Sequence, residues 1–212
     1  MTIARTDDRV GLIQEALVFE WITIAWMVIE AVIAIGAGIA AHSITLTAFG
    51  LDSVIELISA IVLIWRLGVE LKHGQRFSET AERLASKIGG GLLFALAAYV
   101  VLSAAWSIWH GHGQDFSLPG LAVAVAAIPI MYFLAKRKIS LAERIGSRAL
   151  RADAVESITC GWLCCVVVVG LAGQYLVGAW WIDAVTSLGI VWFVVKEGRE
   201  AWKGEACCND CH

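Results

Sequence analysis

Long apolar segments constrain this chain more than any other feature of its sequence. An α-helix that crosses the hydrocarbon core of a bilayer needs about 20 consecutive, mostly apolar residues. Six segments meet this requirement, and we expect each to span a membrane. The expected spans are Ala16–Ile39, Ile44–Leu67, Ile88–Trp109, Leu118–Ala135, Ala149–Val177 and Ala179–Val195. The sequence therefore predicts an all-α membrane protein with six transmembrane helices.

The composition supports this prediction. Of the 212 residues, 59% are hydrophobic, whereas about 45–50% is usual for a soluble domain. The formal net charge of -3 argues against a nucleic-acid partner. We expect a transmembrane domain over residues 1–203 and a Cys/His-rich cytoplasmic tail over residues 204–212. The expected location is the bacterial inner (cytoplasmic) membrane, with the lipid bilayer as the surrounding phase.

The distribution of basic residues predicts the orientation in the membrane. Lys and Arg are frequent in the connections that follow the second and fourth spans and in the segment after the sixth. The other three connections contain neither residue. Because cytoplasmic loops carry an excess of Lys and Arg, we expect both termini to be cytoplasmic.

Basic residues fall only at the cytoplasmic ends of the expected spans, and all the other charged residues within the spans are acidic. These residues are Glu20, Glu30, Asp52, Glu56, Asp153, Glu156 and Asp183. A carboxylate at the bilayer centre costs a few kcal/mol, and we expect Lys and Arg only at the cytoplasmic ends of the spans. Two explanations remain open. The acids bind a cation, or they are neutral, hydrogen-bonded groups that only pack the bundle.

The spacing of two acidic pairs favours the cation site. Asp52 and Glu56 lie four residues apart, as do Glu156 and Cys160, so each pair shares one helical face. The surrounding stretches, "AFGLDSVIE" and "ADAVESITC", match at most positions. In the expected topology these helices run in opposite directions, which indicates an inverted repeat of the kind found in transporters. Chance similarity between apolar helices is the alternative.

Three stretches resemble helices of a known family. "SITLTAFGLDSVIELIS", "ALRADAVESITC" and "WWIDAVTSLGIV" are similar to the second, fifth and sixth transmembrane helices of the cation diffusion facilitators. The resemblance covers residues 14–203, nearly the whole chain. It implies that the first, second, fourth and fifth helices surround a divalent metal ion midway across the membrane. The third and sixth helices would pack beside them.

The resemblance also implies the ligands and the partners. Its first ligand pair falls on Asp52 and Glu56 and its second on Glu156 and Cys160, where the family usually has His and Asp. Members of the family exchange the metal for protons. The resemblance therefore implies that protons are the second transported species and that this chain forms a homodimer. We expect this chain to lack the folded cytoplasmic domain that usually follows the sixth helix.

The proposed ligand set predicts which ions are carried. Oxygen and sulfur ligands in a set of four suit tetrahedral Zn²⁺. A thiolate argues against Mg²⁺ and Ca²⁺ and disfavours Mn²⁺, whereas Cd²⁺ would also bind and Fe²⁺, Co²⁺ and Ni²⁺ are compatible. We expect the metal to be the cargo and expect no further cofactor. Metal binding releases protons from such ligands, so alternate exposure of the site predicts proton antiport.

Three further residues are candidate accessory groups. Glu30 is an additional ligand or proton acceptor, or else a neutral acid bonded within the bundle. Cys164 is a second soft contact one turn from Cys160, or a small buried hydrophobe. Asp153 lies near the cytoplasmic end of its span, and we expect it to assist metal access or to position the helix. Asp183 is expected to have a structural role.

The end of the chain has a further cluster of soft ligands. Cys207, Cys208, Cys211 and His212 are enough to hold one Zn²⁺ or Cu⁺ near the cytoplasmic entrance. A reduced tail without a metal is the alternative interpretation.

These features predict a transporter that exports divalent transition metal, with Zn²⁺ as the expected ion, by proton antiport. The chain has no P-loop motif, which argues against an ATP-driven pump. A membrane protein that senses or buffers metal without transporting it is the alternative function. We do not expect an enzyme, because no nucleophile with an adjacent His base occurs in the spans.

Overall fold

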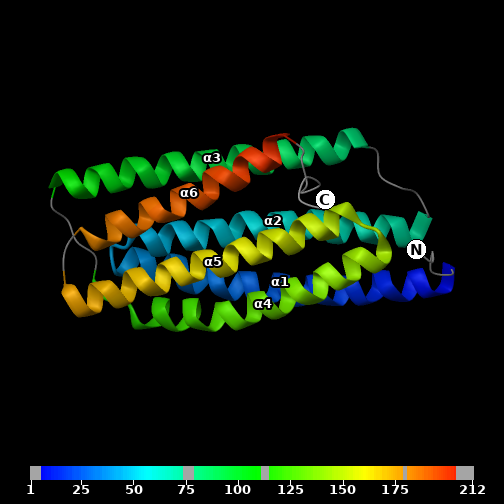
Figure 1. Cartoon of the computed structure of the whole chain (residues 1–212), viewed down its shortest axis with the longest axis horizontal. Coiled ribbons are helices and arrows are strands. Elements are labelled where there is room, and N and C mark those ends of the chain that lie inside the picture. Colours follow the sequence, from blue (N-terminus) through cyan, green and yellow to red (C-terminus); the bar gives the residue numbers. More distant parts are fainter. Residues whose placement is uncertain (1–5, 74–78, 111–114, 179–180, 204–212) are drawn as a thin grey trace, which may run out of the picture.

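A computed structural model describes residues 6–73, 79–110, 115–178 and 181–203, and the regular structure in these ranges is helical (Figure 1). Consecutive helices run in opposite directions. The helices are α1 (Thr6–Ala40), α2 (Ile44–His73), α3 (Glu79–His110), α4 (Leu118–Ile145), α5 (Arg148–Val177) and α6 (Ile182–Lys203). The predicted all-α architecture is therefore confirmed.

Five helices, α1 to α5, are long and apolar enough to cross a membrane, as judged over the described residues. These five correspond to the first five predicted spans. The sixth helix, α6, is present but is not among these five, so its role as a span remains a prediction. The orientation of the termini and the inverted repeat also remain predictions.

The fourth helix extends further than expected. The segment after Ala135 was predicted as a cytoplasmic loop, but α4 continues to Ile145. It ends at Gly146, whose φ of 73° is the left-handed conformation common after a helix. The prediction was wrong because the apolar positions continue at helical spacing past the hydrophobic segment, as Leu141 and Ile145 show.

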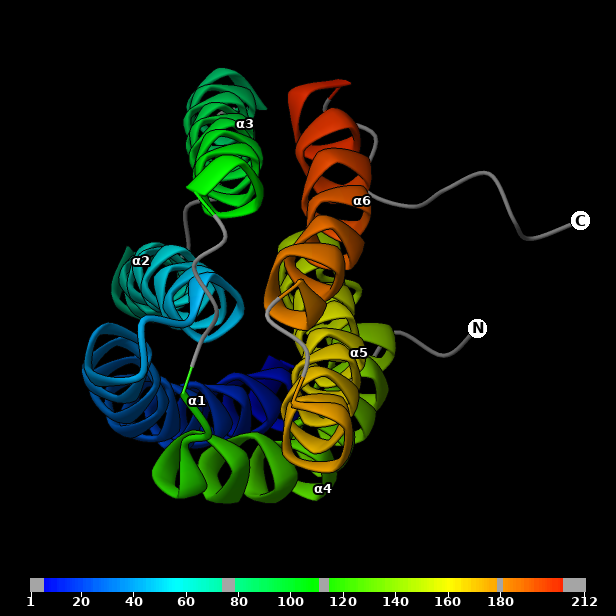
Figure 2. The ribbon, with the colours of Figure 1, turned by 90° about the vertical axis from the view of Figure 1, so that its left-hand side faces the viewer.

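The helices form a group of four with a pair beside it. Helices α1, α2, α4 and α5 pack around a common centre, while α3 and α6 pack against each other and beside α2 and α5 (Figure 2). This is the arrangement that the family resemblance implied. It places the acid-bearing faces of α2 and α5 in the interior of the bundle.

The outer surface of the bundle is apolar. Large side chains such as Trp21, Leu102 and Tyr132 are exposed on it. A soluble monomer rarely exposes so much contiguous apolar surface, whereas lipid chains cover it favourably. The exposed surface therefore agrees with an integral membrane protein.

Asp183 joins the start of α6 to the start of α2. Its carboxylate accepts hydrogen bonds from Ser43 Oγ (2.8 Å) and from the backbone N–H groups of Ile44 (2.7 Å) and Thr45 (3.2 Å). The first N–H groups of a helix lack partners within that helix and favour a negative charge. Asp183 therefore caps α2 from another helix, in agreement with the structural role predicted for it.

Helices α1 and α2 approach each other closely at Gly50. A Cβ atom at this position would lie 2.8 Å from the backbone nitrogen of Ile35 and 2.6 Å from its Cγ1 atom. Only glycine fits such a contact without movement of the neighbouring helix. The close approach brings Ser53, one turn further along α2, against Glu30 of α1.

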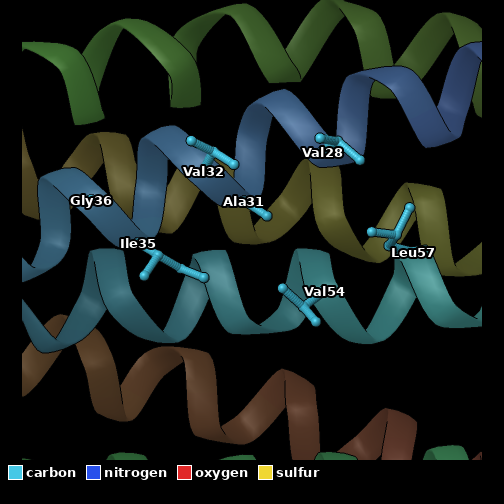
Figure 3. A pocket seen from close by; sticks show the side chains of 7 residues that line it. All are labelled: Val28, Ala31, Val32, Ile35, Gly36, Val54 and Leu57. Carbon is cyan, nitrogen blue, oxygen red and sulfur yellow. The ribbon is translucent and has the colours of Figure 1, made fainter.

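A shallow groove lies between α1 and α2, on the face that Figure 3 shows. Its lining is aliphatic apart from one glycine. The lining residues are Val28, Ala31, Val32, Ile35, Gly36, Val54 and Leu57. Because none of these side chains offers a metal ligand, the groove is not a cation site.

Candidate metal site

The first predicted ligand pair lies on the inner part of α2. Asp52 is buried and Glu56, one turn further along, is partly buried. Asp52 lies two residues from Gly50 and so on the opposite side of α2 from the contact with α1. The two carboxylates therefore share one face of a helix whose neighbouring residues are mostly apolar.

The second predicted pair lies on α5, which packs against α2. The Glu156 side chain is within electrostatic range of Asp52, and the Cys160 thiol is within range of Glu56. Cys160 is fully buried, whereas Glu156 is partly buried. The two pairs thus approach each other across the contact between α2 and α5.

Glu30 of α1 reaches the same region. Its Oε1 atom accepts hydrogen bonds from Ser53 Oγ at 2.7 Å and from Cys160 Sγ at 3.7 Å. Its Oε2 atom accepts one from Trp26 Nε1 at 2.8 Å. Glu30 is also within electrostatic range of Asp52. The side chain predicted as an accessory group therefore connects α1 to both ligand-bearing helices.

The tightest group of possible ligand atoms differs from the predicted set of four. Within the described ranges, atoms of Glu30, Cys160 and Cys164 lie within 4.8 Å of one another, and all three residues are buried. Of the four predicted ligands, only Cys160 belongs to this group. Sequence reasoning had named Glu30 and Cys164 only as accessory. The spacing of Cys164 from Cys160 was the signal that pointed to the α5 half of the group.

Two other acids have a basic partner that the sequence did not reveal. Lys138 of α4 is fully buried, and its Nζ atom forms ion pairs with Glu20 Oε2, at 3.2 Å, and with Asp153 Oδ2. Lys138 lies just beyond the predicted end of the fourth span, but the expectation that these acids have no basic partner was wrong. Lys138 had been assigned to a loop, but it lies on the buried face of the extended α4 helix.

This ion-paired group gives Asp153 a defined position. Asp153 is held to α4 by Lys138 and lies within electrostatic range of Glu156. Asp153 therefore lies between the ion-paired group, which joins α1, α4 and α5, and the predicted ligand Glu156 on the next turn of α5. Whether Asp153 assists metal access or positions the helix remains a prediction.

The predicted tail site, Cys207, Cys208, Cys211 and His212, lies outside the described residues. It remains a prediction. The ligand roles of Asp52, Glu56, Glu156 and Cys160 are likewise carried forward as a proposal.

Two curated transport proteins are similar to this chain. An uncharacterized transporter from Synechocystis sp. is 29% identical over 184 residues, which cover 79% of this chain and 59% of the relative. A manganese efflux system protein from Bacillus subtilis is 24% identical over 184 residues, which cover 84% of this chain and 62% of the relative. The matched part of this chain thus spans about three-fifths of the length of these curated relatives.

A family model covers almost the whole bundle. The cation efflux transmembrane domain matches residues 21–204, which include the two ligand pairs and all of α2 to α6. A match over most of the chain, together with helices long enough to span a bilayer, identifies an integral membrane protein. The chain therefore belongs to the cation efflux family.

Proposed function

We propose that this protein exports a divalent transition metal ion from the cytoplasm and exchanges it for protons, with Zn²⁺ as the preferred ion. The observation that carries the proposal is the approach of two ligand pairs, from α2 and α5, inside membrane-spanning segments. Asp52, Glu56, Glu156 and Cys160 would bind the ion as cargo. Membership of the cation efflux family supports the transport of a cation.

The preference for zinc rests on the ligand types. Three carboxylates and one thiolate suit a four-coordinate Zn²⁺, and the thiolate favours softer ions over Mn²⁺. Manganese is the second candidate, because one relative is a manganese efflux protein and carboxylates suit that ion. Competition between Zn²⁺ and Mn²⁺ for uptake into the same vesicles distinguishes the two candidates.

Proton exchange follows from the ligands that the ion must share with protons. Carboxyl and thiol groups lose their protons when they bind a metal. If the site faces each side of the membrane in turn, protons bind after the metal leaves and are released when the next ion binds. An inward proton gradient would then drive metal out of the cell.

The test is metal uptake into proteoliposomes by the wild type and by Asp52→Ala. We expect the substitution to abolish uptake, because it removes a ligand from α2. Folding should persist, because Ala also removes a buried charge that is costly in the membrane. Glu143→Ala, at an exposed acid on α4, is the matched control and should transport normally. Normal transport by a folded Asp52→Ala protein would refute the site.

The same vesicles address the alternative function and the predicted homodimer. A sensor or buffer would bind metal in detergent but would not accumulate it inside a sealed vesicle. We also expect two copies per particle, which light scattering of the purified protein measures. A monomer that transports at the full rate would refute the predicted homodimer without affecting the transport proposal.

A further inference from the structure

The fully buried group of Glu30, Cys160 and Cys164 shares one residue, Cys160, with the proposed transport site. Its two thiols lie one turn apart on the same face of α5, and its carboxylate comes from α1. No Lys or Arg bonds any of these three groups in the contacts of the described residues. The group therefore combines two soft ligands with one anionic ligand in a water-poor interior.

The distances suit a bound metal. Tetrahedral Zn²⁺ with Zn–S of about 2.3 Å and Zn–O of about 2.0 Å requires about 3.5 Å between sulfur and oxygen and about 3.8 Å between two sulfurs. The separation of Cys160 Sγ from Glu30 Oε1 is already 3.7 Å. The remaining ligand atoms lie within 4.8 Å of one another, so small side-chain rotations would complete the site.

The carboxylate of Glu30 is also held as a metal ligand would be. Both of its oxygen atoms accept hydrogen bonds, one from Trp26 and one from Ser53. Hydrogen bonds of this kind orient ligating carboxylates in metal sites. Ser53 directly follows Asp52 in α2, so the support for Glu30 comes from the helix that carries the first ligand pair.

We propose that Glu30, Cys160 and Cys164 form a second, softer binding position for thiophilic dications such as Zn²⁺ and Cd²⁺. This inference rests on the proposed function and extends it, because Cys160 belongs to both positions and an ion would pass from one to the other. Three protein ligands leave one coordination position open for water, which suits an ion that must leave again. Binding releases the two thiol protons to solvent and forms two metal–sulfur bonds.

Cys165 provides an internal control. It is adjacent to Cys164, but it is only partly buried and does not belong to the cluster. Cys164→Ser and Cys165→Ser therefore make the same chemical change at neighbouring positions. Only the first removes a ligand of the proposed position.

The experiment titrates Cd²⁺ into the purified full-length chain and records the ultraviolet charge-transfer absorption of cadmium–thiolate bonds. Serine replaces the three tail cysteines so that they do not contribute. These are Cys207, Cys208 and Cys211. We expect Cys164→Ser to lose about half of the absorption, since one of two thiolates is gone, and Cys165→Ser to keep all of it.

Ser53→Ala tests the support for Glu30 without removing a ligand. We expect cadmium affinity to fall about tenfold, as is typical when a group that orients a metal ligand is removed. Equal absorption and affinity in Cys164→Ser and Cys165→Ser would overturn the proposed position. Thermal unfolding of each variant identifies any that fail to fold.

This measurement is made at equilibrium and does not depend on transport. Vesicle uptake with no thiolate absorption in the tail-substituted protein would overturn the soft position and the ligand role of Cys160, and would leave metal transport itself in place. Thiolate absorption in a protein that never accumulates metal in vesicles would overturn the proposed function instead.

Discussion

At the scale of single residues, Lys138 changes the interpretation of the buried acids. Its ion pairs with Glu20 and Asp153 account for two acids that would otherwise need a proton or a metal. Glu30 and Asp52 are also buried, and neither forms an ion pair with Lys or Arg within the part of the chain that the structure describes. The structure thus separates acids that join helices from acids that are available to a cation.

Lys138→Met should destabilise the protein strongly. The substitution leaves two buried carboxylates without their cation, and breaking a buried ion pair in this way costs about 3–5 kcal/mol. Thermal unfolding in detergent measures the loss, and Lys136→Met, at an exposed position on the same helix, should have little effect. The loss should shrink at lower pH, because protonation of the two acids removes their charge. Equal stability of both variants would contradict the role of Lys138.

Cys160 should determine the preference for soft ions. Cys160→Asp keeps a ligand but replaces sulfur with oxygen, so transport should persist while the preference shifts from Cd²⁺ toward Mn²⁺. Cys160→Ala should lower affinity for every ion. Competition of Cd²⁺ and Mn²⁺ against Zn²⁺ uptake measures the ranking. An unchanged ranking in both variants would show that Cys160 only packs the bundle.

At the scale of helices, the contact between α1 and α2 positions the site. Gly50 lets the two helices approach closely, and Ser53 of α2 then bonds Glu30 of α1. The cap from Asp183 holds the start of the same helix. The position of α2 is therefore set at its start by Asp183 of α6 and at Gly50 by the contact with α1.

Gly50→Ala should destabilise the protein and lower transport. The added methyl would overlap the backbone of Ile35, and overpacking of this kind costs about 1–3 kcal/mol. Gly36→Ala is the control, because nothing lies within 4 Å of a Cβ atom there. Thermal unfolding and vesicle uptake together measure the effect. If both variants behave like the wild type, the helices are free to separate at Gly50.

At the scale of the whole molecule, α2 and α5 bring the predicted ligands together while α1 and α4 enclose them. The ion-paired group joins α1, α4 and α5 near the end where α4 stops and α5 begins. The pair formed by α3 and α6 lies to one side (Figure 2). The ligands proposed for both metal positions lie on α1, α2 and α5, within the group of four.

Exchange for protons predicts that a pH gradient drives transport. Vesicles with an interior more acidic than the medium should take up Zn²⁺ faster, because protons leave as metal enters, and the interior pH should rise during uptake. A trapped pH dye measures the proton flux, and an ionophore that collapses the gradient is the control. Uptake that is indifferent to the gradient would contradict antiport and leave metal transport itself in place.

Much of the fold could be predicted from the sequence because it depends on local pattern. The apolar segments predicted an all-helical structure with six spans, and the structure bears out five of them. These could be predicted because a bilayer requires length and apolarity of each helix separately. The four-residue spacing placed Asp52 with Glu56 and Glu156 with Cys160, because helical periodicity alone decides which residues share a face.

The tertiary structure decided which residues from different helices meet. Nothing local indicated that Lys138 would lie between Glu20 and Asp153, although its place among buried Leu134, Leu141 and Ile145 of α4 was a usable signal. The grouping of Glu30 with Cys160 and Cys164 likewise depends on how α1 lies against the other helices. Glu20 and Lys138 lie 118 positions apart and Glu30 and Cys160 lie 130 apart, so only the packing of whole helices determines these contacts.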